Sequence, residues 1–483
     1  MLAFASLLGG CAVGPDYRPP APAALGVPDA YSIASPTASP PDLSVWWRQF
    51  GDPLLTDLIG RATAGNLDIV VAQTRLRQAR EALIQTRSTL FPSIGGSAGV
   101  SHNVTYAPEG TVVIGGGNSG TGGAIVTTGG NSAINQFSLG LNASWQADVF
   151  GGTRRSIEAA RADADVALFN LAGVRTSVAG EVATNYVSAR LAQARLAIAR
   201  DTLRTQDDNL QIAGWRVQAG LVSSVDAEQA RAQRAQTAAS IPLLETSFTN
   251  AVNRIGVLTG QAPGALRTAL QVDGPIPHGP DRIAVGIPAD TLRQRPDVRA
   301  AERNLASATA QIGVARAQLF PALAITGTIN TAAARVGSLT DIITGALFAG
   351  LTQTIFDAGR LRSQVRSARA GADNAFATYK QTVLGGLEEV ENAIQAIESA
   401  QARQAELTTA VDASNNAAIL ARSQYRVGLT DFLRLLQSEQ SLLSARDQLA
   451  SAQADQALAL IRLYLALGGG WLPDTPEMIG PLQ

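Results

Sequence analysis

Few side chains in this sequence have the type and spacing that catalysis or metal binding requires. The chain has only two histidines, His102 and His278, in a predicted strand and a predicted linker. Two isolated imidazoles are too few for a typical metal cluster. The glycine run at 115–117 precedes no helix and no Gly-Lys-Ser/Thr sequence, so it does not indicate a phosphate-binding loop. We therefore expect no catalytic residue, no metal and no cofactor, and we expect that the protein is not an enzyme.

The single cysteine, Cys11, lies in a context that indicates modification rather than a disulfide. It follows Leu-Leu-Gly-Gly at 7–10, as in a bacterial lipobox, where a cysteine becomes the lipidated N-terminus. We expect residues 1–10 to be part of a secretory signal peptide whose basic beginning lies upstream. A covalent lipid with two or three acyl chains on Cys11 would anchor the protein stably in a membrane.

The composition excludes other classes of protein. The formal net charge is −1, so no long-range field attracts nucleic acid. Hydrophobic residues make up 46% of the chain but aromatic residues only 5%, a mixture that suits long, closely packed helices. No run of about 18 uncharged apolar residues follows Cys11, so no transmembrane helix is expected. If the chain spans a membrane, it must do so as a closed β-barrel.

Two hydrophobic periods follow each other along the chain. Apolar and polar side chains alternate at 135–150, which predicts a strand with one apolar and one polar face, and weaker alternation predicts strands at about 94–106, 322–331 and 342–356. The Gly-rich segment 110–130 is expected to be a flexible loop. Steps of three and four predict long helices, at about 153–218, 224–258, 359–425 and 432–467.

The order of these elements repeats. The sequence at 301–330 resembles that at 72–101, with Phe320-Pro321 in the place of Phe91-Pro92. The predicted parts are a Pro-rich tether at 11–41, a first repeat at 42–258 with a helix pair at 153–258, a linker at 259–290, a second repeat at 291–467 with a helix pair at 359–467, and a tail at 468–483.

Four predicted strands per chain require assembly. Strands of about ten residues are long enough to cross a bilayer, but four strands cannot close a barrel. Two copies would supply eight strands and three would supply twelve, and a pore for large solutes favours twelve. A helix of about 66 residues is about 100 Å long. We expect a mainly α protein in which three chains build an α-barrel of long coiled helices continuous with a 12-stranded β-barrel.

Four motifs resemble the TolC-like outer membrane factors, in the lipoprotein branch that serves resistance-nodulation-division efflux. They are CAVGPDY at 11–17, WWRQFGDPLL at 46–55, IPADTLRQRPDVRAAE at 287–302 and IFDAGR at 355–360. The resemblance covers the chain from Cys11 to Gly470. It implies a homotrimeric outer membrane channel that passively conducts small molecules from the periplasm to the exterior. It also implies a periplasmic adaptor and an inner membrane pump as partners, and a belt around the tunnel built partly from the termini and the 259–290 linker.

The resemblance further implies a gate at the periplasmic ends of the helix pairs. By matching the turns, Asp226 and Tyr425 occupy the positions of a polar link that holds the closed state, and a Tyr hydroxyl donating to a carboxylate suits that role. Asp226 is equally explained as an acid favoured by the dipole at a helix start. Thr430 stands in the place of an arginine of that link.

At the constriction this chain departs from the family pattern. Arg434 and Gln437 stand where the family has aspartates, so either the gate is differently charged or Asp431 supplies the acid. The turns nearby resemble the tips that contact the adaptor, although glycine at a helix end is also ordinary C-cap chemistry. Those tip residues are Gly220, Leu221, Val222, Ser223, Gly428, Leu429 and Thr430.

A second function remains open from the sequence. The long helices and Cys11 would also suit a lipid-anchored periplasmic coiled-coil scaffold without a pore. A scaffold needs no strands, so the two readings differ over the four alternating segments.

Overall fold

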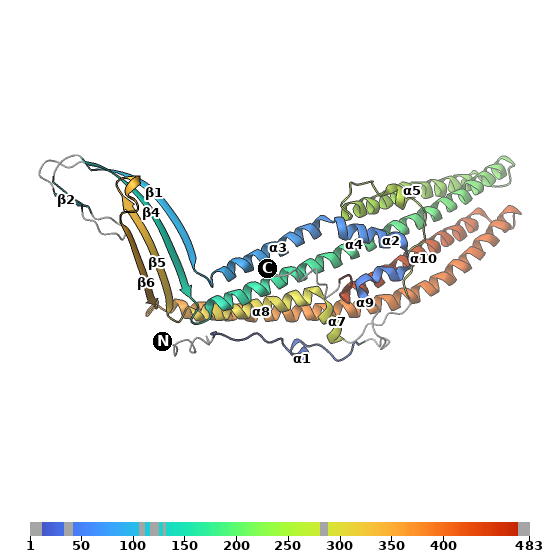
Figure 1. Cartoon of the computed structure of the whole chain (residues 1–483). Coiled ribbons are helices and arrows are strands. Elements are labelled where there is room, and N and C mark those ends of the chain that lie inside the picture. The colour runs from blue at the N-terminus through green and yellow to red at the C-terminus, as the bar shows by residue number, and fades with distance from the viewer. Residues whose placement is uncertain are drawn as a thin grey trace. The chain divides into compact units, whose positions relative to one another are not determined.

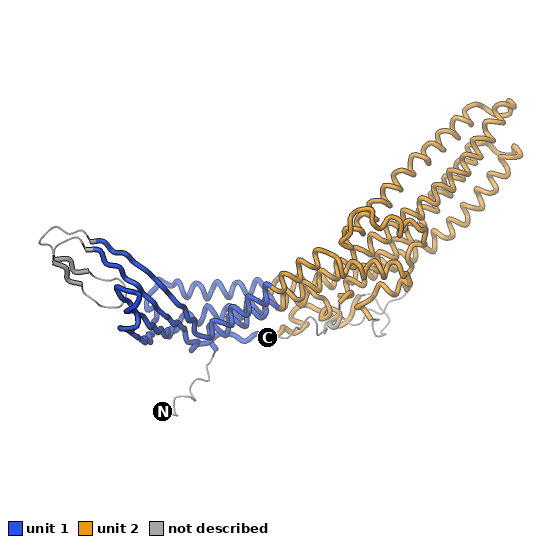
Figure 2. The backbone as a smooth tube through the Cα atoms, turned by 45° about the horizontal axis from the view of Figure 1, so that its top comes forward, with its two compact units in different colours: residues 1–18, 78–164, 304–375 blue, residues 19–77, 165–303, 376–483 orange. Residues whose placement is uncertain are grey.

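The computed structural model describes residues 12–32, 42–105, 112–115, 125–128, 132–280 and 288–471 (Figure 1). Cys11 and the end of the predicted tail lie outside these residues. The chain divides into two compact units, 1–18, 78–164 and 304–375 in the first, and 19–77, 165–303 and 376–483 in the second (Figure 2). Both sequence repeats contribute to both units, so a repeat is not itself a compact unit.

A four-stranded antiparallel sheet belongs to the first unit. Its order is β1 (Ser93–Thr105), β4 (Ser132–Ala147), β5 (Ala322–Ala333) and β6 (Ile343–Thr352), which confirms the four predicted strands. β6 ends before the predicted 356, because Asp357 already accepts hydrogen bonds from the backbone N–H groups of Gly359 and Leu361 at the start of the next helix.

The prediction that the segment 110–130 is entirely a loop is wrong. Two short strands, β2 (Val112–Gly115) and β3 (Ile125–Thr128), pair with each other in a separate two-stranded sheet. Both runs are rich in β-branched residues, which favour extended backbone. These short runs lie among many glycines, and the glycines led to the prediction of a loop.

The register of the four-stranded sheet separates two chemically different faces. Directly paired residues share a face, and the pairs Leu139–Thr331, Leu141–Ile329 and Trp145–Ile325 place the apolar side chains of β4 and β5 together. The opposite face carries mainly Ser, Thr, Asn, Gln, Gly and Ala, with Ile134 and Phe348 as large exceptions. On the apolar face, eight large aliphatic side chains are between 47% and 82% exposed: Ile94, Val100, Leu139, Leu141, Ile329, Ile343, Leu347 and Leu351.

The sheet joins four helices at one end. α3 (Leu67–Ser88) and α8 (Pro296–Ala317) lead into β1 and β5 through the two Phe-Pro pairs, while α4 (Gly152–Gln218) and α9 (Arg360–Arg426) follow β4 and β6. The indole N–H of Trp145 donates to the carbonyl of Leu90 at 2.9 Å, which fastens β4 to the end of α3. Phe150 stacks on Phe320 with ring centroids 4.8 Å apart.

Long helices dominate the second unit, and their bounds confirm the predictions to within one residue. α5 is Ser224–Leu258 and α10 is Phe432–Ala466, and each is paired through a tight turn with the preceding helix, α4 or α9. Short helices complete the described chain, at α1 (Pro22–Leu25), η2 (Leu43–Phe50), α2 (Pro53–Gly65), α6 (Arg267–Leu270), α7 (Pro288–Gln294) and η3 (Val336–Ser338). No helix in the described part of the chain has an 18-residue stretch apolar enough to span a membrane.

An aromatic core fastens the segment before α2 to the end of α10. Trp46 is fully buried and stacks on Tyr464, with ring centroids 5.3 Å apart, and Phe50 meets both rings edge-on. The Tyr464 hydroxyl donates to the Gln49 side chain at 2.7 Å. The WWRQFGDPLL motif therefore packs through Trp46 and Phe50 against the C-terminal end of α10.

A polar cluster borders this core. The Tyr186 hydroxyl of α4 donates to Asp52 Oδ2 at 2.5 Å, while Asp52 Oδ1 caps α2 by accepting from the N–H groups of Leu54 and Leu55. Arg190 donates to the Tyr186 hydroxyl and to the carbonyl of Val272. The cluster therefore connects the start of α2, the helix α4 and the predicted linker.

We predict that Tyr186→Phe lowers the free energy of unfolding by about 1–3 kcal/mol, because Asp52 and Arg190 lose a buried hydrogen-bond partner. Burial, followed by the Asp52 carboxylate, raises the pKa of Tyr186 to about 12. A raised pKa means that the neutral phenol stabilises the fold fully below about pH 10, and that this contribution is lost as the pH rises toward 12. Denaturant unfolding from pH 8 to 12 should show a steeper loss of stability in the wild type than in Tyr186→Phe.

Tyr379→Phe is the control, because the Tyr379 hydroxyl makes no hydrogen bond with a described residue. Equal stability losses for both variants would contradict a special role for the Asp52 cluster.

Candidate functional site

The two helix pairs end in turns of the same construction. In the first, the N–H of Leu221 bonds to the carbonyl of Arg216 at 2.8 Å, and in the second the N–H of Leu429 bonds to that of Gln424 at 2.9 Å. Gly220 and Gly428 have φ values of +68° and +80°, which an L side chain rarely adopts. Such turns usually bury the leucine, but Leu221 and Leu429 are 68% and 78% exposed. The tips therefore present apolar side chains outward.

Tyr425 lies in a small core directly behind these turns. Its ring is buried and meets Phe432 edge-on at 5.6 Å, and the Arg216 guanidinium lies over the ring at 4.6 Å while donating to the Tyr425 carbonyl at 2.6 Å. The Tyr425 hydroxyl makes no hydrogen bond with a described residue, so the expected bond to Asp226 is not formed in this structure. Burial raises the pKa of Tyr425, against the opposing charge of Arg216.

The other predicted gate residues lie around this core. Asp226 is half-buried in the first turn of α5, and Thr430 is half-buried in the second turn. Asp431 caps α10 by accepting from the N–H of Arg434 at 2.9 Å. Arg434 and Gln437 are exposed on α10, and Arg434 forms no ion pair within the described part of the chain. The structure thus assigns a capping contact to Asp431 and leaves the Arg434 side chain available for other groups.

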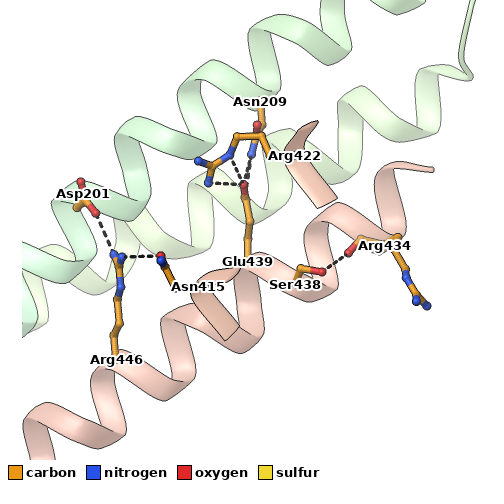
Figure 3. A network of polar contacts seen from close by, with 8 residues as sticks. All are labelled: Asp201, Asn209, Asn415, Arg422, Arg434, Ser438, Glu439 and Arg446. Atoms are coloured by element: carbon orange, nitrogen blue, oxygen red, sulfur yellow. Dashed lines mark hydrogen bonds and ion pairs between the residues drawn. The ribbon is translucent and has the colours of Figure 1, made fainter. Parts of the chain in front are cut away.

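A buried carboxylate, Glu439, connects three helices one to two turns from these residues (Figure 3). Only 8% of the side chain is exposed, and it belongs to α10. Asn209 of α4 donates to both carboxylate oxygens at 2.8 Å, and Arg422 of α9 approaches at 3.1 Å. A buried charge is tolerated only when it is paired and hydrogen-bonded, and Glu439 satisfies this condition with partners from two other helices.

A second contact follows two turns further along α10. Arg446 forms an ion pair with Asp201 of α4 at 3.0 Å and donates to Asn415 of α9 at 3.4 Å. Arg204 and then Arg446 lower the pKa of Asp201, which keeps its carboxylate charged. Figure 3 shows both contacts on the same side of α10, while Arg434 points away from them. We call Asn209, Glu439, Arg422, Asp201 and Arg446 the tip network.

The sequence analysis missed the tip network, although a signal was present. Phe432, Leu435 and Glu439 follow one another at steps of three and four, so an acid occupies a position of the apolar seam. A polar residue in such a seam indicates a specific partner. The partners themselves, Asn209 and Arg422, lie 230 and 17 residues away and carry no pattern that identifies them.

The described residues contain no group of three or more His, Cys, Asp or Glu side chains placed to hold a metal ion. His102 faces Asn135 across the β1–β4 pair at 2.6 Å, on the same sheet face as Val100 and Leu139.

Comparison with known proteins gives consistent results. The family model for outer membrane efflux proteins matches residues 58–261 and 287–469. Nodulation protein T of Rhizobium leguminosarum bv. trifolii is 31% identical over 97% of both chains, and the pyoverdine export outer membrane protein OpmQ of Pseudomonas putida is 29% identical over 95% of both.

Solved structures agree with these matches. The outer-membrane channel OprN superposes with a TM-score of 0.83 at 34% identity, over 95% of this chain and all of that one. OpmQ is an export protein and OprN a channel. The resemblance found in the four sequence motifs is confirmed, and the chain belongs to the outer membrane efflux protein family as an efflux channel of the outer membrane.

Proposed function

We propose that three copies of this chain form a gated conduit that lets small molecules pass from the periplasm through the outer membrane. In this proposal the four strands of each copy contribute to a 12-stranded barrel, and the long helices form the periplasmic tunnel. The observation that carries the proposal is the sheet itself. It has one apolar face, one polar face, and no Asp, Glu, Lys or Arg in any of its four strands.

The edges of the sheet support assembly by closure. β1 and β6 each lack a partner on one side within the described chain, and the alternating directions in the order β1-β4-β5-β6 make β6 antiparallel to a β1 of another copy. Unpaired backbone groups in hydrocarbon cost several kcal/mol each, about as much as an unmade hydrogen bond in an apolar solvent. Phe91 before β1 and Phe356 after β6, which are 71% and 88% exposed, would meet at the same seam.

The proposed gate lies at the tips of the helix pairs. Asp226, Tyr425, Thr430, Asp431, Arg434 and Gln437 remain its candidate residues. The tip network supports a closed state, because it holds α10 against both α4 and α9 close to the turns. The exposed leucines of the turns, with Val222, Ser223 and Thr430 beside them, would contact the helical hairpin of a periplasmic adaptor that links the channel to an inner membrane pump.

The proposed lipid anchor at Cys11 is supported by the residues that follow it. The N–H of Val13 donates to the carbonyl of Phe150 at 3.1 Å, and Asp16 pairs with the buried guanidinium of Arg155 at 2.6 Å. This segment therefore lies against the junction of β4 and α4. A lipid on Cys11 would be carried at the same end of the sheet as the four helix junctions.

The primary test is single-channel conductance of the purified protein in planar bilayers, with the oligomer mass measured on the same sample. Small, rarely open steps from a trimer would support the proposal. A monomer without conductance would favour the scaffold alternative, in which the strands have no role.

Neighbouring positions on opposite faces of β4 offer a matched pair of variants. Leu141→Arg should cost about 2–4 kcal/mol of membrane insertion near the bilayer centre, because it places a guanidinium on the lipid face. Asn142→Arg should insert normally and shift the ion selectivity of the channel, because it faces water. Heat-stable trimer in outer membrane fractions measures insertion. If both variants insert equally well, the assignment of the two faces is wrong.

Glu439→Gln should raise the fraction of time in the open state about tenfold, since the amide still accepts from Asn209 but the charge-assisted bond to Arg422 becomes a neutral bond that is weaker by about 1–1.5 kcal/mol. Glu228→Gln is the control, because Glu228 is 63% exposed and pairs only with Arg231 on its own helix. Open times come from single-channel records. An unchanged open fraction in Glu439→Gln would show that the tip network stabilises the fold without holding the gate.

A further inference from the structure

The first turns of α9 carry a concentration of arginine that the fold does not explain. Arg360, Arg362, Arg366 and Arg369 lie within ten residues and are all exposed. Among the residues that the structure describes, none of the four forms an ion pair. The first turn of α9 contains no acid. Positive side chains at a helix N-terminus oppose the helix dipole, so this arrangement does not serve the stability of the helix.

The corresponding helix of the first repeat is built differently. α4 also begins with arginines, but Arg154 pairs with Asp148 at 3.1 Å, and Arg155 pairs with Asp16 at 2.6 Å and Glu158 at 2.7 Å. The two junctions thus have the same position relative to the sheet and different electrostatics. At α9 the Asp357 carboxylate, which accepts from the N–H of Leu361, lies near Arg360, but no carboxylate of the described chain pairs with Arg362, Arg366 or Arg369.

A second copy of the chain would not supply these partners. If β6 pairs with β1 of the next copy, α9 lies beside that copy's α3. The sheet-side end of α3 carries Arg80 and Arg87 against a single acid, Glu81. The seam between copies would therefore gather more positive charge, and closure of the assembly increases the need for an anion.

We propose that the arginines at the start of α9 bind the phosphate groups of anionic phospholipid at the periplasmic surface of the outer membrane. The inference rests on the proposed function, because it places the sheet in the bilayer. β6 ends at Thr352, so α9 begins eight residues beyond the last strand residue. Its first ten residues cover about 14 Å along the helix axis, within reach of a headgroup layer for a long arginine side chain. A guanidinium also matches phosphate in geometry by donating two parallel hydrogen bonds.

The test uses the intact protein in detergent, with lipid adducts counted by native mass spectrometry during titration with phosphatidylglycerol or with phosphatidylcholine of the same chain length. The test variant is Arg362→Gln, Arg366→Gln and Arg369→Gln combined. The control combines Arg200→Gln, Arg231→Gln and Arg234→Gln, which removes the same charge from exposed positions on α4 and α5. Each surface arginine contributes about a fivefold effect, so the test variant should bind phosphatidylglycerol roughly 100-fold more weakly.

The control and the wild type should bind phosphatidylglycerol equally and prefer it to phosphatidylcholine. Equal weakening in both variants, or no weakening in the test variant, would overturn the proposal. Displacement of phosphatidylglycerol by millimolar inorganic phosphate would assign the arginines to a free anion instead. Unchanged lipid binding with altered anion selectivity in the test variant would place the arginines along the conducted path and also overturn it. Conductance of the wild-type trimer, measured on the same preparation, tests the proposed function separately.

Discussion

The four-stranded sheet with its two unpaired edges is the constraint on which the rest of the structure depends. Its backbone groups at β1 and β6 need partners, and its apolar face needs an apolar environment. In the proposed assembly a bilayer supplies that environment but cannot supply hydrogen bonds, so other copies of the chain would close the edges. The internal repeat builds this sheet from two similar halves of the chain. Each half of the chain brings two strands and delivers two helix ends to the same end of the sheet, from which the long helices continue.

The long helices face a different requirement, since apolar seams alone leave the register of neighbouring helices poorly specified. Here polar groups within the seams select it. Glu439 is acceptable in a buried position only where Asn209 and Arg422 meet it, and Arg446 is anchored between Asp201 and Asn415. The same contacts hold α10 near the turns. A polar seam can therefore specify one arrangement of helices, and in the proposed gate these are the contacts that must break when the turns separate.

Arginine side chains occur in at least two different environments in this chain. At the buried Arg155, the carboxylates of Asp16 and Glu158 pair with the guanidinium and make its burial tolerable. At the start of α9 the arginines are exposed and lack such partners in the described chain. The contrast between two helices at equivalent places in an internal repeat is informative, because the repeat itself acts as the comparison. It separates arginines that hold the fold together from arginines available to a molecule outside it.

Local sequence patterns were sufficient to predict many of the helices and strands of this protein. Period two and the three–four steps predicted the four strands and placed α5 at 224–258, where the structure has it, because these patterns depend only on which face of an element is apolar. The four sequence motifs were sufficient to identify the family. Contacts between distant segments were decided only by the tertiary structure: Tyr186 finds Asp52 across 134 residues, Glu439 finds Asn209 across 230, and the Tyr425 hydroxyl finds no partner where Asp226 was expected. Such contacts depend on how helices are rotated and shifted against each other by packing along their full length, and no local pattern in the chain encodes that.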